Sequence, residues 1–179
     1  MSIAGVAIWC KNLHLQDIEL AVREFTILIH PNEVVALANT AYVIAATYLM
    51  NHAGEEKRNV MAFEEAEKWL ISKGNKDLIG WMDTIKGTVG SIDELLKQVP
   101  PNKAEGWIKI AFTYAMHFLL AGAPFKKAIE KIINVKGDTD TNACIVGALL
   151  GAYHGLSGLD MQVQIDKICQ YKGRVFKRP

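Results

Sequence analysis

The residues best suited to chemistry lie in one short run, residues 137–142, which read Gly-Asp-Thr-Asp-Thr-Asn. Asp138 and Asp140 are separated by one residue, and in an extended loop residues two apart point to the same side. Their carboxylates can therefore converge on one ion, and the Thr141 hydroxyl adds a third oxygen. Oxygen ligands of this kind suit Mg²⁺, Mn²⁺ or Ca²⁺ rather than zinc or copper. The run predicts a metal site with Asp138, Asp140 and Thr141 as its ligands.

Helix capping is the alternative interpretation of the same run. The run lies directly before an apolar stretch, residues 142–153, that we expect to form a buried central helix. An Asp or Thr at this point would satisfy backbone N–H groups of the first helical turn. Capping needs only one such side chain, whereas two aspartates this close repel each other unless a cation or several donors lie between them. The motif by itself leaves both interpretations open.

The elements that position this run are predicted to be helices, because apolar residues recur at steps of three and four almost throughout the chain. The longest stripes cover residues 34–49, 107–118 and 142–153. The one short run with strand-like composition, residues 26–29, is too short to change this prediction. The sequence therefore predicts a single all-α domain of about eight helices over residues 1–179.

Several helix ends are marked by capping residues. Asn32 is a predicted N-cap, and Ser91 with Glu94 has the spacing of a capping box. Gly74 is a predicted helix stop, and Asp160 is predicted to cap the last helix.

Composition and charge exclude several classes of protein. The chain has 179 residues, of which 50% are hydrophobic and 22% are charged, so it can form a core and is not disordered. A formal net charge of +1 argues against a nucleic-acid partner, because phosphate binding needs a basic face. The basic residues within 172–178 are interpreted as a solvated tail.

The cysteines and the apolar stretches indicate the compartment. Cys10, Cys144 and Cys169 form no Cys-x-x-Cys pair, so neither a zinc site nor a disulfide framework is indicated, and Cys144 is expected to be buried. No signal peptide is recognisable, and residues 143–153 fall short of the roughly 20 that a membrane span needs. Residues 108–125 are interrupted by charged and polar side chains. We expect a soluble, cytoplasmic protein without a membrane partner.

The wider context of the Asp138 run resembles one known family. Residues 137–143, followed by the glycine-rich stretch 145–155, look like the C-terminal metal motif of the ADP-ribosylglycohydrolases. Gly106-Trp107 and residues 125–133 are similar to the helices that precede this motif in the family.

The resemblance continues toward both ends of the chain. His30-Pro31-Asn32, followed by Asn39 and Tyr42, resembles the family's Thr-His-Pro-Asn stretch, although a different context replaces the threonine. Weaker likenesses occur at residues 6–9 and 173–179. The resemblance therefore covers nearly the whole chain, in order, but corresponds to the C-terminal half of the family's proteins.

This resemblance implies a function. The family fold is an all-α bundle in which two divalent ions, Mg²⁺ or Mn²⁺, orient ribose hydroxyls and activate water for removal of ADP-ribose from modified proteins. Carried over, Asp138, Asp140 and Thr141 would be metal ligands, and His30 would line the ADP-ribose cleft. No catalytic residue can be assigned. The other histidines show no ligand spacing, and we interpret them as structural or surface residues.

The chain also departs from the family. It contains no Thr-Asp-Asp motif, no adjacent aspartate pair and no counterpart of the family's first helix with its catalytic glutamate. Three ligands supply only half of a two-ion site, because two hard cations together take about a dozen oxygen positions. We therefore expect the lone chain to be incomplete as a hydrolase.

Three hypotheses follow. The chain is part of a split or truncated hydrolase that needs an N-terminal partner chain. Alternatively it is an inactive pseudoenzyme that serves as a helical binding or oligomerisation module, because absent N-terminal helices would uncover apolar faces that favour homo-oligomers. The third hypothesis is an unrelated helical interaction module with a capped loop at residues 138–142.

Overall fold

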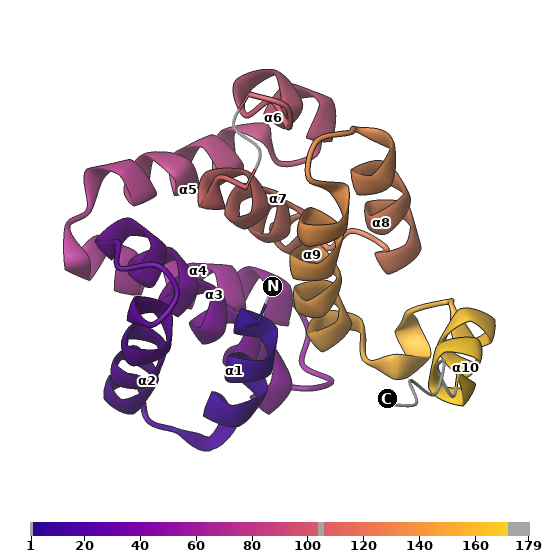
Figure 1. The fold of residues 1–179 in the computed structure, drawn as a ribbon, viewed down its shortest axis with the longest axis horizontal. Coiled ribbons are helices and arrows are strands. Elements are labelled where there is room, and N and C mark those ends of the chain that lie inside the picture. Colours follow the sequence, from indigo (N-terminus) through magenta and orange to yellow (C-terminus); the bar gives the residue numbers. More distant parts are fainter. Residues whose placement is uncertain (1, 104–105, 172–179) are drawn as a thin grey trace, which may run out of the picture.

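The computed structural model describes residues 2–103 and 106–171 of the chain, and this part is helical throughout (Figure 1). Two 3-10 helices, η1 (Cys10–Asn12) and η2 (Leu156–Gly158), join ten α-helices. The α-helices are α1 (Ile3–Trp9), α2 (Leu15–Ile27), α3 (Glu33–Asn51), α4 (Arg58–Lys73), α5 (Lys76–Thr88), α6 (Ile92–Gln98), α7 (Ile108–Leu120), α8 (Phe125–Asn134), α9 (Thr139–His154) and α10 (Gln162–Gln170). The all-α prediction is confirmed, with more helices than expected. The basic residues predicted as a solvated tail lie outside the described residues.

The core is built around α3, α7 and α9. Ten consecutive residues of α7, from Ile110 to Leu119, are buried, and α3 buries most of its length. α7 packs on α9, α5 and α4, whereas α3 packs on α2, α4, α1 and α9. Buried apolar side chains from α1 to α9 form one cluster. The three longest predicted stripes are therefore the three central helices.

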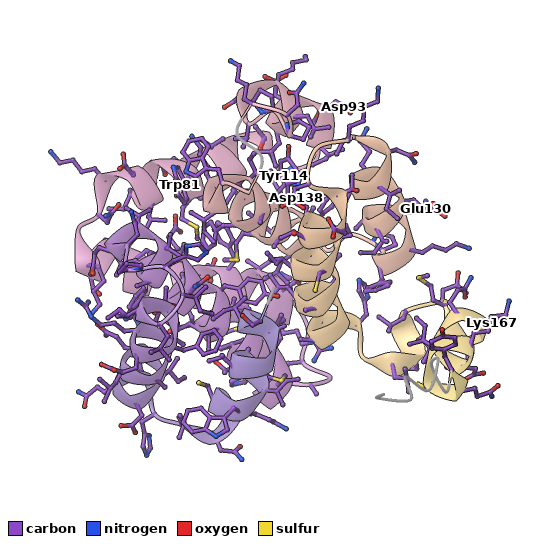
Figure 2. The ribbon with its side chains drawn as sticks, in the orientation of Figure 1. Trp81, Asp93, Tyr114, Glu130, Asp138 and Lys167 are labelled. Atoms are coloured by element: carbon purple, nitrogen blue, oxygen red, sulfur yellow. The ribbon has the colours of Figure 1, made fainter. Side chains whose placement is uncertain are left out.

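A buried hydroxyl group at the centre of the bundle finds a backbone partner. The Tyr114 hydroxyl donates to the carbonyl oxygen of Val99 at 2.7 Å, and burial raises the pKa of Tyr114 to about 12. Figure 2 shows Tyr114 inside the bundle, whereas Asp93, Glu130 and Lys167 point outward from its rim. These charged side chains stay at the surface, because burying a charge away from water costs free energy.

The predicted helix ends are mostly confirmed. Asn32 caps α3, Ser91 accepts a hydrogen bond from the Glu94 N–H at 3.3 Å, and Gly74 ends α4 with a left-handed backbone (φ 69°). The prediction for Asp160 was wrong. Asp160 itself has a left-handed backbone (φ 51°), and α10 begins only at Gln162, after an N-cap at Met161.

Among the described residues, α3 is the one helix long and apolar enough to cross a membrane. Its most apolar window has a mean hydropathy of 1.4, and 67% of that window is buried inside the fold. The core helix of a water-soluble protein has the same length and composition. The helix is therefore compatible with the predicted lack of a membrane partner.

One buried-residue prediction was wrong. Cys144 is exposed, whereas Cys10 is fully buried, and all three cysteines are free. α9 buries the face that carries Asn142, Ile145 and Val146, and Cys144 lies on its other side. α9 therefore has one solvent-facing side, although its sequence is mostly apolar.

Candidate functional site

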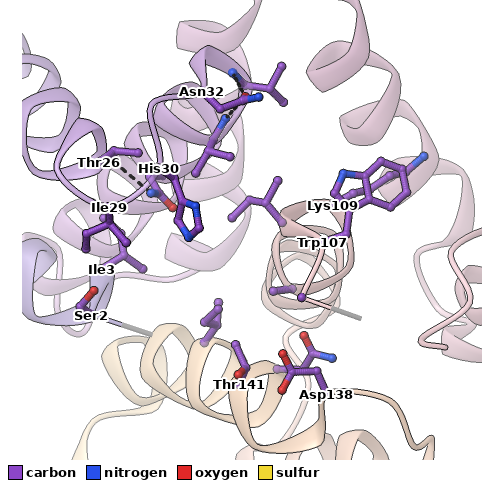
Figure 3. Close-up of a pocket in the computed structure, with 18 of the residues that line it drawn as sticks. Ser2, Ile3, Thr26, Ile29, His30, Asn32, Trp107, Lys109, Asp138 and Thr141 are labelled. Atoms are coloured by element: carbon purple, nitrogen blue, oxygen red, sulfur yellow. Dashed lines mark hydrogen bonds between the residues drawn. The ribbon is translucent and has the colours of Figure 1, made fainter. Parts of the chain in front are cut away.

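A cavity of about 630 Å³ lies between the α2–α3 region, the start of α7 and the start of α9 (Figure 3). α5 contributes Asp77 and Trp81 to its wall, and α9 contributes three residues from its first turns together with its N-cap residue, Asp138. Among the described residues, those that line the cavity are Ser2, Ile3, Phe25, Thr26, Ile29, His30, Asn32, Val34, Val35, Asn39, Asp77, Trp81, Gly106, Trp107, Ile108, Lys109, Ala111, Asp138, Thr141, Asn142 and Ile145. The volume lies in the range of small-molecule sites.

The loop before α9 is fixed by a glycine that no other residue could replace without strain. Gly137 has φ +78°, a left-handed conformation that L side chains rarely adopt. A Cβ at this position would overlap the carbonyl oxygen of Pro101 and lie 3.0 Å from the Pro101 carbonyl carbon. Lys136 is also left-handed (φ 69°). This tight turn delivers Asp138 to the mouth of the pocket.

Asp138 stands at the N-cap of α9, but its side chain caps nothing. Its main-chain oxygen accepts the Asn142 N–H at 3.0 Å, which starts the helix at Thr139. Its carboxylate accepts no hydrogen bond from the first turn and lines the pocket instead. The expectation of an extended loop was wrong, because Asp140 already lies in the first helical turn.

The Asp140 carboxyl nevertheless lies near the Asp138 carboxyl. Hydrogen bonding with the Asp138 carboxyl, then with backbone N–H groups of Thr141 and Asp140, lowers the pKa of the Asp140 carboxyl. Asp140 is exposed and does not line the pocket, whereas Asp138 and Thr141 do. One aspartate therefore faces the cavity, and the other supports the helix end behind it.

The oxygen atoms present here suit one hard cation rather than two. Asp138, Asp140 and the Thr141 hydroxyl offer three hard-oxygen groups, and water would have to complete the coordination of even a single Mg²⁺ or Mn²⁺ ion. Within residues 2–103 and 106–171, no group of three or more His, Cys, Asp or Glu side chains is arranged to hold a metal. The metal roles stay predictions.

The structure brings His30 to the same cavity. His30 lies in the loop between α2 and α3, is exposed, and lines the pocket. Its ring extends into the cavity from the side opposite Asp138 and Thr141 (Figure 3). Three residues predicted from two separate parts of the sequence thus line one cavity, and the role of His30 in binding ADP-ribose stays a prediction.

Two other residues of the His-Pro-Asn region support the walls. The Asn39 side chain donates to the Thr26 hydroxyl at 3.1 Å, and both residues line the pocket. The Tyr42 hydroxyl donates to the carbonyl oxygen of Ile145 at 2.8 Å and thereby ties α3 to α9. Burial raises the pKa of Tyr42. These contacts hold the two helices that carry the predicted site.

An aromatic and cationic wall was not predicted from the sequence. The Lys109 Nζ lies 5.3 Å from the centre of the Trp107 ring and 5.8 Å from that of Trp81. The two indoles meet edge to face, with 6.2 Å between their centres. Lys109 interrupts a mostly apolar helix, and that interruption was a signal for Lys109 itself but not for the wall that it forms with the indoles.

His117 is the buried histidine of the core and lies outside the pocket. Its Nε2 atom is 3.0 Å from the carbonyl oxygen of Thr88, and its Nδ1 atom has no partner among the described residues. Burial lowers its pKa, and the hydrogen bond to Thr88 opposes that effect. The structure agrees with a structural interpretation of this residue.

Comparison with known proteins identifies the family. No curated protein and no solved structure gives a significant match to this chain. The family model described as ADP-ribosylglycohydrolase matches residues 1–174, which is nearly the full length. This match includes both the loop that carries His30 and the helix end that carries Asp138. The chain belongs to the ADP-ribosylglycohydrolase family.

Proposed function

We propose that this chain binds the ADP-ribose group of modified proteins in the 630 Å³ pocket and takes part in its metal-dependent removal. The observation that carries the proposal is the gathering of His30, Asp138 and Thr141 on one cavity, in a chain matched by the family model. A pocket of this size and mixed lining is suited to a ligand with sugar, phosphate and base parts.

The start of α9 supplies the polar chemistry of the proposed site. The Asp138 carboxyl caps no backbone N–H group of α9, so it has an oxygen available to accept hydrogen bonds from ribose hydroxyls or to hold Mg²⁺ or Mn²⁺. Thr141 adds a hydroxyl on the same wall. A bound divalent cation would supply charge stabilisation at the ribose. His30, across the cavity, would orient the ligand by hydrogen bonding.

A binding assay tests the first part of the proposal. Calorimetry with ADP-ribose in Mg²⁺, in Mn²⁺ and in excess chelator should show metal-enhanced binding by the wild-type chain. The double variant Asp138→Asn, Asp140→Asn should lose the metal enhancement while keeping its fold. Binding that is equal with and without metal would contradict the proposed ion.

An activity assay tests the second part. The chain is incubated with an ADP-ribosylated peptide and Mg²⁺ or Mn²⁺, and released ADP-ribose is measured. Release that disappears in the Asp138→Asn, Asp140→Asn variant supports a competent site. Release that survives this variant would place the chemistry elsewhere.

A second candidate function is ADP-ribose binding without hydrolysis, as in a pseudoenzyme. The observation that favours it is the small ligand set, with two carboxylates and no third acidic, histidine or cysteine group beside them among the described residues. A chain that binds ADP-ribose but releases none from the peptide would support this candidate.

The small ligand set also motivates a proposal about partners. Further carboxylates could come from an N-terminal partner chain or from a second copy of this chain. Turnover that appears only after addition of the carboxylate-bearing N-terminal segment of a family member would support a split hydrolase. Activity that rises with the chain's own concentration, together with a dimer in sedimentation, would support the homo-oligomer.

A further inference from the structure

The pocket holds a single strong cation among its described lining residues, Lys109. The remaining charged groups on the wall are Asp77 and Asp138, and His30 also lines the cavity. No described carboxylate lies within 4.0 Å of the Lys109 ammonium, because none of the ion pairs in the described residues includes it. Among the described residues the Lys109 ammonium thus has no direct carboxylate counter-ion, and Lys109 lines a cavity that also carries the carboxyl groups of Asp77 and Asp138.

Two indole rings hold this ammonium in place. The Nζ atom lies over Trp107 at 5.3 Å and over Trp81 at 5.8 Å, both within the range of cation–π attraction. Lysine is normally flexible, and fixing its side chain on binding costs conformational entropy. Since the indoles already restrict Lys109, less of this cost falls on ligand binding.

The position of Lys109 determines which part of a ligand it meets. Figure 3 shows Trp107 and Lys109 on the α7 wall, away from Asp138 and Thr141 on the α9 wall. A ligand that spans the cavity would therefore place hydroxyl groups near α9 and a negative group near α7. A nucleoside or free ribose has no such negative group, whereas a nucleoside diphosphate sugar has one in its middle.

Resting on the proposed function, we propose that Lys109 is the residue that recognises the diphosphate of ADP-ribose and makes the pocket selective for nucleoside diphosphates over nucleosides. The ammonium donates charge-assisted hydrogen bonds to phosphate oxygens. Asp77 lines the same cavity and opposes this attraction by repelling phosphate. The two residues therefore affect affinity in opposite directions.

The test compares ligands on matched variants. ADP-ribose, ADP, inorganic pyrophosphate, adenosine and ribose are titrated by calorimetry into the wild type and into Lys109→Met, which keeps most of the aliphatic stem. The control is Lys126→Met, which removes an exposed lysine from α8. Circular dichroism and thermal melting establish that each variant is folded, and Lys109→Gln serves if the methionine variant is not.

The expected result is selective. Lys109→Met should weaken the binding of ADP-ribose and ADP by roughly ten- to one-hundredfold, the effect of losing hydrogen bonds to a charged group. The affinity for adenosine should stay unchanged. Asp77→Asn should strengthen ADP-ribose binding a few-fold. Tryptophan emission should change on adding ADP in the wild type and not in Lys109→Met, because Trp81 and Trp107 contact the lysine.

The outcomes separate this inference from the proposed function. If ADP-ribose binds the wild type and Lys109→Met equally, the diphosphate assignment is overturned while the proposed function stands. If the binding of ADP depends on Lys109 but the affinity for ADP-ribose is the same with and without metal and in the Asp138 variant, the proposed function fails and this inference holds. No binding of any phosphate ligand to the wild type overturns both.

Discussion

Two loops lead into core helices at this pocket, and they use their capping side chains differently. The α2–α3 loop (residues 28–32) ends at Asn32, whose Oδ1 accepts the N–H groups of Val34 at 2.9 Å and Val35 at 3.3 Å. The α8–α9 loop (residues 135–138) ends at Asp138, whose carboxylate accepts no such bond. At the N-cap position, the side-chain oxygen of Asn32 therefore accepts hydrogen bonds from the helix, whereas the side-chain oxygens of Asp138 accept none from the first turn.

The difference separates a structural residue from a candidate functional one. A helix start leaves N–H groups without partners, and a cap at that point normally stabilises it. α9 forgoes the Asp138 cap and is held instead by the Gly137 turn against Pro101 and by Tyr42 on Ile145. A carboxylate that makes no capping hydrogen bond and lines a cavity is suited to bind a ligand. The following predictions test this comparison, beginning with the largest effect.

Gly137→Ala should disrupt the α8–α9 loop. The new Cβ would overlap the Pro101 carbonyl, and the φ of +78° is strained for alanine. We expect a loss of about 2 kcal/mol or more in the free energy of unfolding, together with loss of ligand binding. Urea denaturation followed by circular dichroism measures the change.

Gly151→Ala, within the helix that follows this loop, is the matched control. A Cβ at this position meets nothing within 4 Å, and the backbone is helical. The free energy of unfolding should stay the same or rise by up to about 1 kcal/mol, because alanine favours helices. Equal losses in both variants would mean that α9 tolerates no alanine and that the turn is not special.

Two histidines extend the comparison to pH. Burial lowers the pKa of His117, so the unfolded chain binds its proton first, near the ordinary value of about 6.5. The stability that neutral His117 provides is complete above this value and declines as the pH falls below it. We expect a loss of about 1 kcal/mol between pH 7.5 and 5.5 that His117→Gln removes.

His30 provides the contrast for that experiment. It is exposed in the α2–α3 loop, whereas His117 is buried in the core. His30→Gln should keep the wild-type pH dependence of unfolding, measured by urea titrations at each pH. A His30→Gln variant that flattens this dependence, with His117→Gln behaving like the wild type, would reverse the assignment.

Asn32→Ala should remove the cap of α3. Loss of the two hydrogen bonds to Val34 and Val35 is expected to cost about 1 kcal/mol. Asn32→Asp keeps an accepting oxygen and should restore most of this loss. A wild-type-like melt of Asn32→Ala would show that this cap contributes nothing, and the contrast between the loops would then disappear.

The central helices were predictable, because local patterns determine them. The stripes of α3, α7 and α9 repeat at helical spacing, and Asn32 and Ser91 mark their starts or those of neighbours. α1 was missed because its seven residues include Ile8 and Trp9, which are exposed and blur any stripe. The predictions for Cys144 and Asp160 were wrong because composition shows neither which face of a helix is exposed nor which residue has a left-handed backbone.

The candidate site was predictable only in part. The spacing of Asp138, Asp140 and Thr141 and the likeness to a family pointed to the right helix end, but an extended loop was expected where a helix already begins. The wall formed by Lys109 and Trp81 could not be predicted, since it depends on the packing of α5 against α7. Contacts between residues far apart in sequence arise from tertiary structure, which a local pattern does not encode.

The smallest effect on stability is expected for Asp138→Asn. The carboxylate makes no capping hydrogen bond, so its removal should cost only the helix-dipole attraction, about 0.5 kcal/mol or less. The same variant should lose the rise in melting temperature that Mg²⁺ or Mn²⁺ gives the wild type. Differential scanning fluorimetry with and without metal measures both quantities on one sample. A loss near that of Asn32→Ala, with the metal response intact, would mean that Asp138 is a cap after all and that the two loops work alike.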